Sequence, residues 1–120
     1  MMSKTNADRR RAPRVPAAGE ALLVGRESRS ARMLDVSMRG CLLRTEQPVA
    51  LGQILDVVLS LEGGDVRAKA RVAEVSLDGA GAQARGYLAG MEFLGMAADD
   101  ERRLERFVQA ARRRKSAPAV

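Results

Sequence analysis

The chain has 120 residues and a formal net charge of +6, with 46% hydrophobic but only 2% aromatic residues. This length suits one domain with a modest core. Histidine is absent and Cys41 is the single cysteine, which excludes an internal disulfide, a cysteine-rich zinc site and histidine acid–base chemistry. The scarcity of aromatic rings argues against a protein that stacks single-stranded nucleic acid.

The first elements in chain order are an arm and a series of short strands. Residues 1–13 show no hydrophobic periodicity and are expected to be a flexible basic arm. Pro13 and Pro16 favour an extended chain where the arm joins the domain. Apolar runs separated by turn-forming residues then predict strands. These runs are Glu20–Gly25, Ser30–Val36, Gly40–Thr45 and Ile54–Leu61.

The middle of the chain continues this pattern. Ile54–Leu61 is nearly continuous in apolar residues, which predicts a strand covered on both faces. Gly63-Gly64-Asp65 is typical of a hairpin turn. The following period-two alternation changes phase near Val72-Ala73, which predicts a β-bulge of the kind that helps to close a barrel. A last alternating strand is predicted from Tyr87, Ala89, Met91 and Phe93.

The C-terminal region changes to a helical period. Asp99 and Asp100 can cap a helix and interact favourably with its positive end. The apolar residues that follow have the spacing of one helical stripe. They are Leu104, Phe107, Val108 and Ala111. The sequence therefore predicts a mainly β protein, a six-stranded antiparallel barrel over 14–97, with a C-terminal helix over 98–115 and a tail over 116–120.

The excess positive charge lies at the two ends of the chain. Residues 1–14 carry +4, residues 15–98 carry −1 and residues 99–120 carry +3. A general nucleic-acid binder has a basic face across its folded body, so no specific nucleic-acid partner is expected. The cluster Arg112-Arg113-Arg114-Lys115 suits the C-terminal end of a helix, and a partner contact remains the alternative.

No segment is expected to enter a membrane. The sequence has no apolar run near the ~20 residues that a membrane-spanning helix requires. Residues 1–8 are polar and lack the apolar stretch of a signal peptide. A cytoplasmic location is the expectation.

The loop Asp35-Val36-Ser37-Met38-Arg39-Gly40 is the first candidate site. An ordinary turn uses the same residue types, since Asp and Ser bond nearby backbone and Gly can adopt positive φ. The functional alternative is that Asp35 and Ser37 present a carboxylate and a hydroxyl to the donors on a guanine edge. Gly40 would then leave room for a ligand or for another backbone.

The second candidate is the arginine cluster of the arm. Guanidinium groups pair bidentately with phosphate or with guanine O6 and N7. Arg14 lies where the arm meets the first strand, so it is anchored, whereas Arg9, Arg10 and Arg11 can swing. A solubilising tail that binds anions without specificity is the alternative. The two candidates together predict a site for a small anionic nucleotide.

This combination resembles the PilZ domain family. Arg10 and Arg14 match the RxxxR element of that family, and Asp35, Ser37 and Gly40 match its [D/N]xSxxG element. The family fold is also a six-stranded barrel with a C-terminal helix. The segment Gly90-Met91-Glu92-Phe93 is similar to its last strand.

The resemblance implies a bacterial receptor for the second messenger cyclic di-GMP. Arg10 and Arg14 would then grip guanine edges and phosphates, and Asp35 and Ser37 would hydrogen-bond a guanine. Gly40 would permit close packing. The resemblance also implies that the ligand can bind as a stacked, intercalated dimer.

Arg9 and Arg11 would add phosphate contacts beside this motif. We expect the phosphates to neutralise the repelling arginines, so that the arm folds over the barrel and presents a surface to an unknown protein effector.

Three other functions remain alternatives. Some family members lack nucleotide binding and act as adaptors through protein contacts, and a nonspecific nucleic-acid binder is another possibility. Catalysis is the least favoured, because Asp35 and Ser37 have no histidine beside them and no phosphate-binding P-loop is present. No enzyme activity, cofactor or metal site is therefore expected.

Overall fold

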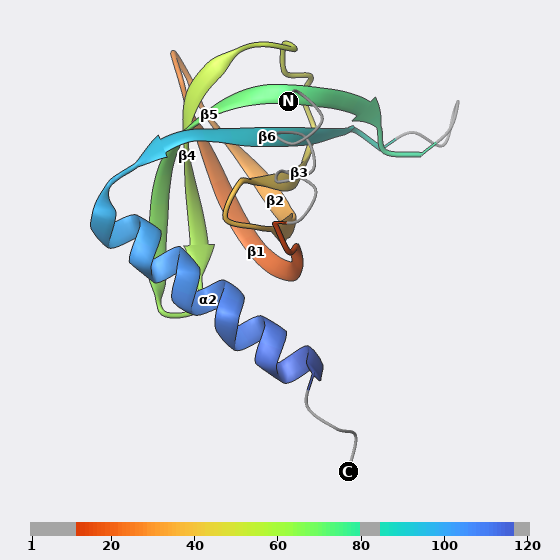
Figure 1. Ribbon diagram of the computed structural model, residues 1–120. Helices are drawn as coiled ribbons and strands as arrows, with labels where there is room; N and C mark the ends of the chain where they lie inside the picture. Colours follow the sequence, from red (N-terminus) through yellow and green to blue (C-terminus); the bar gives the residue numbers. More distant parts are fainter. Residues whose placement is uncertain (1–11, 80–84, 117–120) are drawn as a thin grey trace, which may run out of the picture.

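The computed structural model describes residues 12–79 and 85–116, which form six strands and one helix (Figure 1). The strands alternate inward and outward side chains along most of their length. The elements are β1 (Val15–Val24), β2 (Ser28–Val36), β3 (Gly40–Thr45), β4 (Ile54–Leu61), β5 (Gly64–Leu77), β6 (Tyr87–Met96) and α2 (Ala98–Ser116).

The strands form a closed barrel in the order β1-β2-β3-β6-β5-β4. Every neighbouring pair is antiparallel, including β1 with β4, which closes the ring. The predicted six-stranded antiparallel barrel with a C-terminal helix is thus confirmed.

The barrel interior is filled by aliphatic side chains, as the low aromatic content requires. Met33, Leu43 and Leu59 are among its largest fully buried residues. Small barrels pack their interior in this way and contain no channel. The buried area supplies the main stabilising term, at roughly 25 cal/mol per Å² of apolar surface.

Strand β4 differs from its predicted environment. Leu55, Val57, Leu59 and Leu61 point into the core, whereas Ile54 is 57% exposed, so the burial alternates along the strand. The expectation that both faces are covered was wrong. Among residues 12–79 and 85–116, no second layer packs over the outer face of β4, and its apolar run reflects residues that favour strands rather than double burial.

Strand β5 contains the predicted irregularity. Its register with β6 shifts between Val72 and Glu74, and again between Lys69 and Ala70. The bulge expected near Val72-Ala73 is confirmed. Bulges bend a strand, which allows this 14-residue element to pair with both β4 and β6 around the barrel.

Strand β1 starts earlier than the sequence pattern suggested, at Val15 instead of Glu20. Its register with β2 shifts between Pro16 and Gly19, which is where proline can be tolerated in a sheet. Val15 pairs with Val36. This pairing brings the residue before β1 next to the end of β2, where the candidate loop begins.

Helix α2 lies along the outside of the barrel and packs on β5 and β1 (Figure 1). The predicted apolar stripe is the packed face, since Leu104 and Val108 are buried and Phe107 and Ala111 lie against the core. Its first turn is fixed by Asp100, which accepts a hydrogen bond from the Arg67 backbone N–H at 3.1 Å. Among the described residues, no helix is long and apolar enough to cross a membrane.

Candidate functional site

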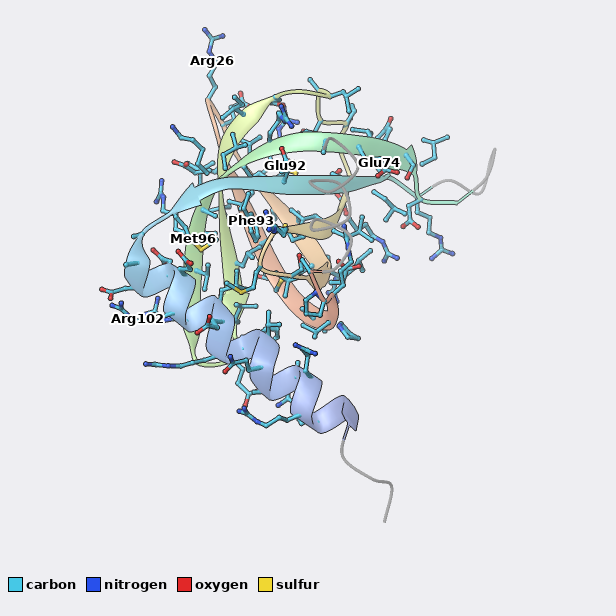
Figure 2. All side chains as sticks on the ribbon, in the orientation of Figure 1. Arg26, Glu74, Glu92, Phe93, Met96 and Arg102 are labelled. Atoms are coloured by element: carbon cyan, nitrogen blue, oxygen red, sulfur yellow. The ribbon has the colours of Figure 1, made fainter. Side chains whose placement is uncertain are left out.

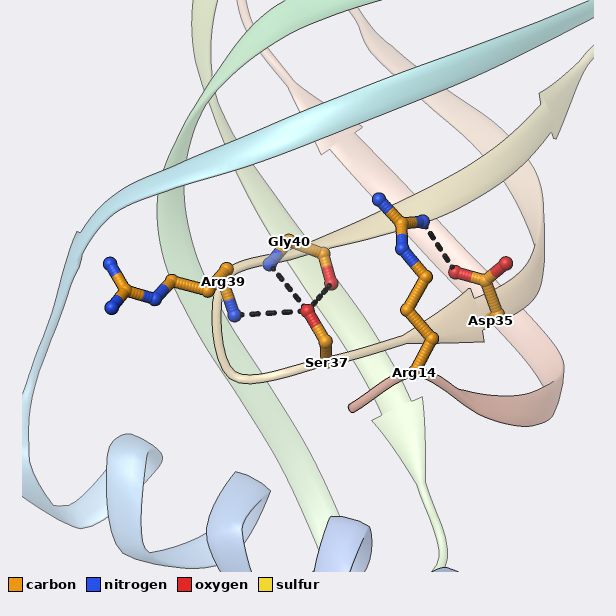
Figure 3. Close-up of polar contacts among 5 residues, drawn as sticks. All are labelled: Arg14, Asp35, Ser37, Arg39 and Gly40. Atoms are coloured by element: carbon orange, nitrogen blue, oxygen red, sulfur yellow. Dashed lines mark hydrogen bonds and ion pairs between the residues drawn. The ribbon is translucent and has the colours of Figure 1, made fainter. Parts of the chain in front are cut away.

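An ion pair joins the two candidate motifs. Arg14 Nη1 lies 3.0 Å from Asp35 Oδ1, although the residues are 21 positions apart (Figure 3). The β1–β2 register creates this contact, because Pro16 pairs with Asp35. The Arg14 side chain is 62% exposed and that of Asp35 is 26% exposed, so both groups remain accessible from solvent.

Ser37 organises the loop that follows. Its backbone N–H donates to the Gly40 carbonyl at 2.8 Å. Its hydroxyl oxygen accepts from the N–H groups of Arg39 and Gly40 at 3.0 and 3.2 Å (Figure 3). The residue is only 3% exposed. Ser37 therefore shapes a tight turn from within, as Ser does in ordinary turns, while Asp35 stays at the surface.

Gly40 is required by packing between strands. It pairs with Glu92 of β6, and a Cβ at this position would lie 2.0 Å from the Met91 carbonyl oxygen. Gly40 is not among the described glycines with positive φ. The close approach of two backbones, rather than a special φ, explains why this position has no side chain.

A pocket of about 370 Å³ opens beside this turn. Arg14, Ser37, Arg39 and Gly40 form one side, and residues of β5 and β6 form the other. Those on the strand side are Ala73, Glu74, Gly90, Met91, Glu92, Phe93 and Leu94. Asp35 is connected to the pocket through its ion pair with Arg14.

Arg39 is a cation of this pocket that the sequence analysis did not select. Its N–H donates to Ser37 Oγ, and its carbonyl accepts from the Phe93 N–H at 2.8 Å, so its backbone is held from both sides. Its side chain extends away from the Arg14–Asp35 pair (Figure 3). Within the described residues its guanidinium makes no hydrogen bond or ion pair.

Glu74 and Glu92 were also missed, and both carry negative charge to the strand side of the pocket. Glu92 is paired with Arg71. Strand pairing brings them to the pocket, since Gly40 of β3 faces Glu92 of β6 and Glu74 of β5 faces Gly90 of β6. The similarity of Gly90-Met91-Glu92-Phe93 to a family strand is the sequence signal that includes Glu92, and by itself it predicts a strand and no site.

Arg9, Arg10 and Arg11 lie outside the described residues. Their contacts with a nucleotide therefore remain predictions. Of the seven predicted ligand-binding residues, the structure brings together Arg14, Asp35, Ser37 and Gly40.

Cys41 follows the loop and is a core side chain. Burial, together with the nearby Asp35 carboxylate and against the opposing effect of Arg14, raises the pKa of its thiol to about 12. The thiol is therefore protonated at neutral pH and is not a nucleophile. In residues 12–79 and 85–116, no cluster of acidic, Cys or His side chains could hold a metal ion.

The sequence matches the PilZ domain over residues 8–110. The chain belongs to the PilZ domain family. This match includes the whole barrel, most of α2, and the part of the arm that carries Arg9, Arg10 and Arg11. No curated protein matches the sequence significantly.

Solved PilZ structures share the fold. The PilZ domain of Escherichia coli YcgR, solved with c-di-GMP, superposes with a TM-score of 0.70 at 18% identity, covering 89% of this chain and 94% of that chain. The K. pneumonia MrkH–c-di-GMP complex gives a TM-score of 0.71 at 25% identity, covering 88% of this chain and 55% of that chain. The Bacillus subtilis inhibitor of motility MotI/DgrA gives a TM-score of 0.70 at 18% identity, covering 89% of this chain and 51% of that chain. The chain thus spans about half the length of MrkH and MotI.

Proposed function

We propose that this PilZ domain is a receptor for cyclic di-GMP, bound at the pocket beside Arg14 and the Asp35–Gly40 loop. The observation that carries the proposal is the Arg14–Asp35 ion pair, which unites the two family motifs at one edge of that pocket. The PilZ domain of YcgR and MrkH, which share this fold, were solved as complexes with c-di-GMP. The proposed activity is binding, without a catalytic step.

The chemistry of the pair suits this ligand. A carboxylate such as Asp35 accepts from the N–H groups of a guanine Watson–Crick edge, and a guanidinium such as Arg14 binds phosphate or guanine O6 and N7. An exposed ion pair contributes only ~0–1 kcal/mol, so exchanging it for ligand contacts costs little. The pair therefore holds both side chains near their working positions before the ligand arrives.

The arm completes the proposed mechanism. Arg10 and Arg14 would contact guanine edges and phosphates, and Arg9 and Arg11 would add phosphate contacts. Neutralising these charges favours an arm that closes over the pocket, and the closed arm would be the surface that a protein effector recognises. An intercalated ligand dimer, with twice the phosphates, fits a cluster of several arginines.

A nucleotide-independent adaptor is the second candidate. Ser37 and Gly40 each satisfy a structural demand of the fold, the turn and the approach to Met91, so the presence of this motif is explained without a ligand. Such an adaptor would act through protein contacts alone and would give no response to nucleotides.

Isothermal titration calorimetry of the full chain with cyclic di-GMP separates the two candidates. We expect heat of binding and a raised melting temperature at ligand concentrations of roughly 0.1 mM, the level that reports an affinity of about 5–6 kcal/mol. Cyclic di-AMP is the matched control, because it keeps the phosphates and changes the base edge. Absence of heat with both nucleotides would favour the adaptor, and equal binding of both would indicate nonspecific anion binding.

Replacing Arg39 by alanine should weaken cyclic di-GMP binding by about fivefold, or about 1 kcal/mol. Arg39 lines the pocket and its guanidinium makes no hydrogen bond or ion pair within the described residues, so it is available to a phosphate. Arg26→Ala is the matched control, because Arg26 projects from the β1–β2 turn away from this pocket (Figure 2). Equal affinities of the two variants for cyclic di-GMP would show that Arg39 does not contact the ligand.

A further inference from the structure

A second pocket, of about 330 Å³, lies between α2 and the turn that joins β4 to β5. It has no described residue in common with the pocket beside Arg14. Its lining combines arginines with apolar atoms. The residues are Glu62, Gly63, Arg103, Arg106, Phe107, Ala110 and Arg114.

Arg103 makes one wall of this groove rigid. It donates to the Asp65 carbonyl at 2.9 Å and lies 3.5 Å from the Asp100 carboxylate. Gly64, with φ +131°, leaves the space for it, since a Cβ there would lie 3.0 Å from Arg103 Cδ. Arg103 thereby links α2 to the β4–β5 hairpin, and these contacts fix its side chain.

Arg106 and Arg114 are differently placed. Arg106 is exposed and makes no ion pair within the described residues, and Arg114 approaches Glu62 only to 3.9 Å. The side chains of Arg114 and Glu62 are 63% and 85% exposed, so this pair contributes little stability. The helix dipole accounts for cations in the last turn, such as Arg114, but not for Arg106 in the middle of the helix.

The floor between these two cations is apolar. Phe107 is half-buried and packs against the core cluster, and Ala110 lies one turn away on the same side of the helix. A concave apolar floor between two available guanidinium groups complements an acidic segment that carries an apolar side chain.

We propose that this groove docks an acidic segment of a partner protein. The carboxylates of the partner pair with Arg106 and Arg114, and one of its aliphatic side chains covers Phe107. Binding to duplex DNA depends mainly on cations that neutralise many phosphates, and an apolar floor between two cations adds nothing to phosphate contacts. This proposal does not depend on nucleotide binding at Arg14.

Fluorescence anisotropy of the full chain, without nucleotide, tests the proposal. The probe is a labelled peptide of about eight residues with one leucine among glutamates, and its twin has glutamine in place of every glutamate. We expect the acidic peptide to bind at least tenfold more tightly than its twin. Arg106→Ala and Arg114→Ala should each weaken binding by about fivefold, whereas Glu62→Gln should strengthen it, because it removes a competing carboxylate 3.9 Å from Arg114.

Arg112→Ala is the matched control on the same helix. At 3.6 residues per turn Arg112 lies about 200° around the helix from Arg114, and it does not line the groove. We expect Arg112→Ala to change the affinity for the acidic peptide by less than twofold. Equal losses of affinity for Arg106→Ala and Arg112→Ala would show nonspecific electrostatic attraction and overturn the proposal. Tighter binding of an unrelated DNA duplex that is lost in Arg106→Ala would also overturn it, by assigning the surface to nucleic acid.

Discussion

Replacing Gly40 by alanine is expected to lower the free energy of unfolding by about 3 kcal/mol, the upper end of the usual cost of overpacking. The new Cβ would lie 2.0 Å from the Met91 carbonyl oxygen. Neither backbone can yield easily, because Gly40 pairs with Glu92 and the Phe93 N–H donates to the Arg39 carbonyl. Relief requires β3 to separate from β6.

Urea unfolding followed by far-ultraviolet circular dichroism measures this effect. Gly25→Ala is the matched control, since a Cβ at Gly25 meets nothing within 4 Å and its φ is not positive. We expect this variant to stay within about 0.5 kcal/mol of the wild type, with a small gain from the less flexible unfolded chain. If both glycine variants unfold at the same urea concentration, the close approach of β3 and β6 is not what requires Gly40.

Replacing Arg14 by alanine should reduce cyclic di-GMP affinity by roughly 30- to 100-fold, about 2–3 kcal/mol, the usual value of a charge-assisted hydrogen bond. A larger loss than at Arg39 is expected because, in the proposed complex, Arg14 would both contact the ligand and orient Asp35, which lies 3.0 Å away. Arg14→Lys keeps the positive charge but loses the planar guanidinium with its paired N–H donors, so a loss of about tenfold in affinity is expected. Stability should hardly change, since the ion pair is exposed.

Lys4→Ala is the control for total charge in calorimetric titrations of these variants. Lys4 belongs to the same basic segment but to neither family motif. We expect less than a twofold change in affinity. Equal losses for Arg14→Ala and Lys4→Ala would support a tail that attracts anions without specificity.

Most of the fold could be predicted because each local pattern agrees with the barrel. The phase change at Val72-Ala73 predicted the bulge, and the stripe that includes Leu104 and Val108 predicted the buried face of α2. The start of β1 at Val15 was missed, because the segment from Pro16 to Gly19 has weak strand preference and pairs with β2 only at its two ends.

The site could be predicted only where its residues form local motifs. Arg14 and Asp35 were selected from such patterns, and the sheet brings them into contact. Arg39 was overlooked because its significance depends on strand β6, which lies across the pocket. The reason for Gly40 was likewise hidden, since a 2.0 Å approach to Met91 is set by the register of two distant segments.

The closure of the ring by β1 and β4 also limits how a partner can be recognised. An open sheet offers unpaired backbone groups along its border, to which another chain can add a strand. In this barrel each of the six strands has a hydrogen-bonded neighbour on both sides over part of its length, and β1 joins β4 through residues 21–24. Side chains, loops and the helix are therefore the main surfaces open to a protein partner, and single substitutions there are expected to change recognition without unfolding the barrel.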